Sequence, residues 1–235
     1  KRNLEVCGFS DAVKLFEDRR SEDITVCRKL GVNYLHLGFT DALWRKKTEV
    51  NPIISFIGNI IPEIIHDYPF YKFNVLSGHI AKGDEVLSEV SNKLKTLRLH
   101  QDKKAIFCPL AIDTHIDHII VNRVCTQVTQ RHSDPAIGGG RIPLARRDPS
   151  ASKTSLRMTN KLIYWLDFPY YLELNDKMKQ MTGEMNLANF SWPAAETKDD
   201  LILTYKSQVI PTFPGGKIPS RPEIYFIDIN FSLIS

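Results

Sequence analysis

Apolar residues recur along the chain with two different spacings, and the two spacings alternate. Short, nearly continuous apolar runs predict buried strands at residues 33–37, 105–109, 161–166 and 223–229. Between them, apolar positions three and four residues apart predict helices at residues 11–30, 84–97, 119–130 and 198–209. Strands that alternate with helices are typical of an α/β fold with a mainly parallel sheet.

Length and composition are those of an ordinary globular domain. The 235 residues are 43% hydrophobic and 25% charged, which is enough apolar material for a core. We therefore expect a single domain over residues 1–235, with a flexible insertion at about 130–160. Three consecutive glycines at residues 138–140 follow a predicted helix instead of opening one, which favours a surface loop or active-site lid over a phosphate-binding loop.

Charge and cysteine content narrow the class of protein. The net charge is +4 with the basic residues scattered, so no nucleic-acid partner is predicted. The four cysteines contain no Cys-x-x-Cys pair, which favours free thiols and a cytoplasmic location; they are Cys7, Cys27, Cys108 and Cys125. The most apolar window, residues 52–65, is too short to cross a membrane, so we expect a buried or substrate-side loop and helix and no integral membrane segment.

Two histidines and two aspartates lie where the predicted strand at 105–109 gives way to the next helix. His115 and His118 are three residues apart, so on a helix they share a face, with Asp117 beside them. The carboxyl ends of strands are where α/β folds bind ligands, and an imidazole next to a carboxylate is typical of a metal site. The residues alone allow an alternative, in which Asp113 or Thr114 caps the helix and the histidines are surface residues.

Several segments resemble, in the same order, those of one enzyme family. Residues 19–23, 30–32 and 35–41 resemble its helix, strand and aspartate-bearing loop, and the His-x-Asp-His at 115–118 follows. Residues 163–170 then resemble a strand ending in an acidic Pro-Tyr loop, and Lys198 with residues 205–208 resembles a late helix. Over nearly its whole length the chain thus resembles the PIG-L/LmbE-like zinc-dependent N-deacetylases.

The resemblance implies a Rossmann-like three-layer sandwich that binds Zn²⁺. It makes His118 a zinc ligand and His115 the residue that stabilises the tetrahedral intermediate and acts as general acid, with Asp117 orienting and tuning His115. Asp41 and either Arg19 or Arg20 fall where the family contacts the sugar of its substrate, although Asp41 also fits a turn cap before Ala42.

One motif of the family is absent from the sequence. The family's other two zinc ligands and its general base come from a His-Pro-Asp-Asp-Glu-like run after the first strand, and no such run occurs in these 235 residues. We therefore expect the first strand and helix to be missing. His118 would then hold only half a site, because catalytic zinc normally has three protein ligands.

Two functions remain open on this evidence. The first is a zinc-dependent hydrolase that removes an N-acetyl or other acyl group from an N-acetylglucosamine-type conjugate, a small-molecule partner. The second is a non-catalytic sugar-binding or scaffold protein of the same fold. Whether this chain is itself an active enzyme, and its oligomeric state, stay open at this point.

Overall fold

The computed structural model describes residues 2–97, 105–130, 161–169, 176, 180, 187–192, 198–213, 215–219 and 222–228. The expected insertion, with its glycines at 138–140, lies outside the described residues.

Four strands form one mixed sheet in the order β1-β2-β4-β3. They are β1 (Ala105–Pro109), β2 (Lys161–Trp165), β3 (Leu187–Trp192) and β4 (Glu223–Asp228). β1 and β2 are parallel, whereas β4 runs antiparallel to both β2 and β3. The expectation of a mainly parallel sheet is therefore wrong for the described strands. An apolar run has the same pattern in either direction, so the sequence predicted the strand at 223–229 without its polarity.

Two further expectations about regular structure are wrong. Residues 32–41, where a strand was predicted at 33–37, form neither helix nor strand, and Tyr34 and Leu35 are 44% and 60% exposed. The helix predicted at 198–209 is two helices, α7 (Lys198–Thr204) and α8 (Lys206–Thr212), because Tyr205 between them has a ψ of 60° that breaks the helix. In both cases apolar spacing alone was insufficient to define the element.

Three predicted helices are confirmed as α2 (Ala12–Leu30), α4 (Val86–Thr96) and α5 (Ile116–Gln130). α2 begins where the Asp11 side chain accepts two backbone amides, and it ends at Gly31, whose φ of 66° is left-handed. α5 begins three residues earlier than predicted, which places His118 in its first turn. Shorter helical segments are α1 (Arg2–Val6), η1 (Ala42–Trp44) and η3 (Tyr71–Val75).

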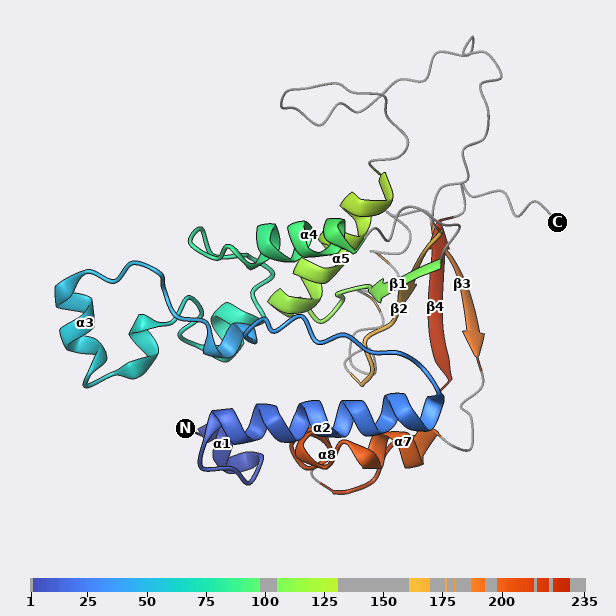
Figure 1. Ribbon diagram of the computed structural model, residues 1–235, viewed down its shortest axis with the longest axis horizontal. Helices are drawn as coiled ribbons and strands as arrows, with labels where there is room; N and C mark the ends of the chain where they lie inside the picture. Colours follow the sequence, from blue (N-terminus) through green and yellow to red (C-terminus); the bar gives the residue numbers. More distant parts are fainter. Residues whose placement is uncertain are drawn as a thin grey trace, which may run out of the picture.

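Helix α5 is the centre of the packing. One of its faces covers β1 and β2, and another contacts α4. The core between α5 and the sheet includes Cys108, Cys125 and Phe226, and the core between α5 and α4 includes Val90 and Ile120. Figure 1 shows α2, α7 and α8 grouped on the side of the molecule opposite α4 and α5.

Residues 46–66 form an arm that stands away from the sheet. Its base is closed by a β-bridge between Lys46 and His66, and it carries α3 (Pro52–Gly58) and η2 (Pro62–Ile65). Figure 1 shows α3 at the outer end of the molecule. Burial was one of the two expectations for residues 52–65, and it is wrong for Phe56 and Ile60, which are 71% and 74% exposed. Among the described helices, none is long and apolar enough to cross a membrane.

Candidate metal centre

The chain turns sharply between β1 and α5. Ala111 and Thr114 have φ values of 62° and 60°, a left-handed conformation that few residues other than glycine adopt. The turn is held by hydrogen bonds, because the Thr114 hydroxyl donates to the carbonyl of Leu76 at 2.8 Å and the His115 amide donates to Asp113 Oδ1 at 3.1 Å. This strained but supported turn fixes Asp113 and His115 at the carboxyl end of β1.

Asp113, His118 and Asp167 form a group, the metal trio, whose polar atoms face one another. His118 Nδ1 lies 2.9 Å from Asp113 Oδ2 and 3.7 Å from Asp167 Oδ1. The two aspartate side chains are 3% and 2% exposed, whereas His118 is 34% exposed. The oxygens that face His118 are Asp113 Oδ2 and Asp167 Oδ1, and apart from these contacts neither of the two has a hydrogen-bond partner among the described residues. Buried acceptors without donors are costly, so the trio fits a bound cation.

The electrostatics of the trio also favour a positive charge between its members. Burial by itself lowers the pKa of His118, but the contact with Asp113 and the charges of both aspartates raise that pKa above its ordinary value. Burial raises the pKa of Asp113, yet His118 reverses this effect and the pKa is lowered overall. The pKa of Asp167 is raised, first by burial. Without metal, a proton on His118 supplies the charge that the carboxylates favour, and a divalent cation fits the same place.

A second group lies beside the trio and consists of Asp41, His115 and Asp117. Its carboxylates already have donors, since Asp41 Oδ1 and Asp117 Oδ2 each accept a backbone amide of η1, at 2.9 and 3.0 Å. Asp117 Oδ1 pairs with Arg45. The ring centroids of His115 and His118 are 5.1 Å apart. This group therefore fits a polar wall next to the metal trio better than a second metal site.

His115 is held in one tautomer when it is neutral. The backbone amide of Asp117 donates to His115 Nδ1 at 3.2 Å, which leaves the ring proton on Nε2. Burial, followed by the positive charge of His118, lowers the pKa of His115 below its ordinary value. The expected role of Asp117 in orienting His115 stays a prediction: the contact between them involves the Asp117 amide, while its carboxylate binds η1 and Arg45.

Arg45 is a central residue of this region that the sequence did not reveal. It is 6% exposed, its guanidinium pairs with Asp84 and Asp117, and its Nε donates to the carbonyl of Thr40 at 2.9 Å. Tyr68 donates its hydroxyl to the same Asp84 carboxylate at 2.6 Å. Arg45 thus links η1 to the first turn of α5. In the sequence it precedes two lysines, so it resembles part of a solvated basic run.

The three expected sugar-contacting residues have different positions. Asp41 lies beside His115 and is also the cap of η1, so its expected contact with the sugar stays a prediction. Arg19 and Arg20 lie on α2 instead: the Arg19 guanidinium is 5.6 Å from the Phe16 ring centroid, and Arg20 lines a hollow with other α2 residues and His36. The described contacts of both arginines therefore lie in and around α2.

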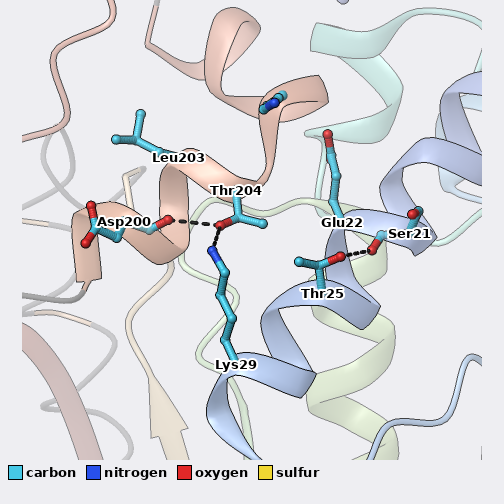
Figure 2. A pocket seen from close by; sticks show the side chains of 8 residues that line it. Ser21, Glu22, Thr25, Lys29, Asp200, Leu203 and Thr204 are labelled. Atoms are coloured by element: carbon cyan, nitrogen blue, oxygen red, sulfur yellow. Dashed lines mark hydrogen bonds between the residues drawn. The ribbon is translucent and has the colours of Figure 1, made fainter.

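A cavity of about 590 Å³ lies between α2 and the α7–α8 pair, and it contains no residue of the metal trio. Figure 2 shows that its polar groups bind one another: Lys29 Nζ donates to the Thr204 hydroxyl at 2.9 Å, and that hydroxyl donates to the carbonyl of Asp200. On α2, the helix that also carries Lys29, the Thr25 hydroxyl donates to the carbonyl of Ser21. Because these polar groups already have hydrogen-bond partners, the cavity is better explained as space between packed helices than as a reaction site.

Comparison with known proteins gives one informative likeness. No family model and no curated protein matches the sequence. Among solved structures, a deacetylase of the teicoplanin biosynthesis pathway, crystallised as a deacetylase–bog complex, matches 96% of this chain and 78% of its own, with a TM-score of 0.50 and 14% identity. That protein is a PIG-L/LmbE-family deacetylase. This chain has the same fold. At such low identity, the likeness concerns the fold and leaves the substrate open.

The PIG-L/LmbE-like fold explains which site residues the sequence revealed. His115, His118 and Asp41 lie in segments whose sequence resembles short motifs of the family, and the structure brings the three residues together. The sequence predicts Asp113 only as a possible helix cap and Asp167 as part of an acidic Pro-Tyr loop that could line the substrate mouth. The two residues are 54 positions apart, yet both face His118. The available signal was that each follows a strand of a parallel pair, since the ends of such strands meet.

Proposed function

We propose that this chain is a zinc-dependent hydrolase that removes the N-acetyl group of an N-acetylglucosamine-type conjugate. The observation that supports the proposal is the buried trio of Asp113, His118 and Asp167, whose facing oxygens lack other partners, beside His115 in a deacetylase-like fold. The sequence predicted His118 as a single ligand. In this proposal Asp113 and Asp167 are the other two, so three ligands are available without a His-Pro-Asp-Asp run.

The ligand set suits zinc in a catalytic role. One imidazole and two carboxylates are ligands that Zn²⁺ accepts, and three protein ligands leave a position open for water or substrate. The 34% exposure of His118 gives the trio a side that faces solvent. A zinc ion held there would polarise an amide carbonyl and lower the pKa of a bound water.

The neighbouring side chains then have separate tasks. In this proposal the Nε2–H of His115 donates a hydrogen bond to the oxygen that becomes negatively charged. The proton that the attacking water releases would be relayed by His115 to the leaving amine, so no net proton is consumed. Asp41 accepts a hydrogen bond from a hydroxyl group of the sugar. Arg19 or Arg20 remains the second proposed sugar contact. The Tyr71 ring, 6.2 Å from that of His115 and 40% exposed, offers an aromatic face for the sugar ring.

The test is acetate release from N-acetylglucosaminides by the zinc-loaded 235-residue chain. We expect His118→Ala to lose zinc, and His115→Gln to keep zinc but lose roughly 10²- to 10⁴-fold in rate, the usual contribution of a general acid or base. His79→Gln is the matched control, because His79 is exposed and its described partners are all on Ser77.

Two results would contradict the proposal. If zinc-loaded protein releases no acetate from a panel of N-acetylglucosaminides yet binds them, the chain is a non-catalytic sugar-binding protein. If His115→Gln and His79→Gln lower the rate equally, the catalytic group lies elsewhere.

A further inference from the structure

The arm, residues 46–66, turns an apolar helix face towards solvent. Ile53, Phe56, Ile57 and Ile60 are 68%, 71%, 37% and 74% exposed, and Ile61 is 45% exposed. Ile53, Phe56 and Ile57 lie on α3 with the spacing i, i+3 and i+4, the pattern of a helix stripe that normally packs on the protein core, and Ile60 and Ile61 follow its end at Gly58. In this arm the stripe faces away from the protein.

The outward direction of this face is fixed by packing on the other side of α3. Gly58 is buried against η2, so closely that a Cβ atom at this position would lie 2.5 Å from Ile65 Cγ2. Asn51 caps the start of α3 by accepting the amide of Ile53 at 2.9 Å, and the Lys47 amide donates to the carbonyl of Ile65 at the base. α3 is therefore held against η2 through Gly58, while most of its other residues are exposed.

The composition of the open face favours lipid over a protein partner. Residues 50–62 contain no charged side chain, and the face has no Trp, Tyr or Arg, the residues that usually anchor protein interfaces. Its exposed area is roughly 600 Å² at about 200 Å² for each fully exposed residue. A stable dimer usually buries about 800 Å² on each partner, with a polar rim. Insertion into a lipid surface requires only apolar side chains on one face.

We propose that the arm inserts this apolar face into the interfacial layer of a lipid bilayer and anchors the protein peripherally. The inference goes beyond the proposed function and does not depend on it. The base of the arm follows directly after Arg45, which pairs with Asp117 next to His115. Insertion of the arm would therefore hold the metal trio and its neighbours near the membrane surface.

The experiment is co-sedimentation of the full chain with sucrose-loaded phosphatidylcholine vesicles, without added zinc or substrate. We expect the wild-type chain to sediment with the vesicles. The double variant Phe56→Ser/Ile60→Ser should lose on the order of a hundredfold in partition coefficient, because two large apolar side chains no longer enter the lipid. Val13→Ser/Ile210→Ser is the matched control, since both residues are 63% exposed and lie outside the arm.

The proposal is overturned if wild-type protein stays in the supernatant at millimolar lipid, or if both double variants lose binding equally. Light scattering after gel filtration tests the competing occupant. A wild-type dimer that becomes monomeric in Phe56→Ser/Ile60→Ser, without vesicle binding by either protein, would assign the face to a second copy of this chain. Thermal melts of all proteins exclude loss of folding as the cause of a difference.

Discussion

Replacing Asp167 by asparagine separates metal binding from folding at the trio. Asp167 Oδ2 accepts the amide of Ile112 at 3.2 Å, and an asparagine oxygen can keep this bond. Oδ1, the atom that faces His118, becomes an uncharged NH₂ group that can donate to Asp113. The variant thus removes one charged ligand while the side chain keeps nearly the same size and position.

The two expected effects have opposite signs. Loss of a ligand should weaken zinc binding at least about 100-fold, or about 2.7 kcal/mol, since even the partners of ligands contribute 10- to 100-fold. Without metal, the variant should be more stable, because burial raises the pKa of Asp167 and an ionised acid of raised pKa opposes folding at neutral pH. A buried acceptor without a partner costs about 1–3 kcal/mol, and each kcal/mol corresponds to about 2–4 °C in Tm for a chain of this size.

Zinc affinity is measured by competition with a chromophoric chelator, and Tm by scanning calorimetry with zinc or with EDTA. The wild-type chain should melt higher with zinc, and Asp167→Asn should melt higher in EDTA. Asp41→Asn is the control, because Asp41 acts as a cap and its substitution should change zinc affinity less than about threefold. If Asp167→Asn binds zinc as tightly as wild type while His118→Ala does not, the trio is not the metal site.

Two further predictions concern the supports of the site and of the arm. Arg45→Met should lower the free energy of unfolding in urea by about 3–5 kcal/mol, since it leaves the buried charge of Asp84 unpaired, and Arg45→Lys should recover part of the loss. Gly58→Ala should destabilise the arm by about 1–3 kcal/mol through overpacking against Ile65, seen as faster hydrogen exchange in residues 46–66, and Ile65→Ala should relieve that clash in the double variant.

Each of these has a result that would refute it. A loss below 1 kcal/mol in Arg45→Met would mean that Asp84 and Asp117 find other partners. Unchanged exchange in Gly58→Ala would mean that α3 can move away from η2 at little cost, and the fixed outward face of the arm would lose its explanation.

The sequence alone determined several of the local elements and part of the site. The helix at 11–30 was predictable because Asp11 and Gly31 provide a cap and a stop beside a periodic apolar pattern. The strand at 105–109 matched β1 in both bounds, because a short apolar run ending in proline has few other solutions. His115 and His118 were found for a similar reason: their spacing and the turn before α5 are local features.

Only the tertiary structure decided how those elements are arranged and which residues contact one another. The direction of β4 and the outward face of α3 depend on contacts between distant segments, and neither leaves a trace in local periodicity. The same holds for the proximity of Asp113 and Asp167 around His118. It requires β1 and β2 to lie parallel so that their carboxyl ends meet. Apolar pattern records whether a residue prefers burial, but the identity of its neighbour is a property of the folded chain.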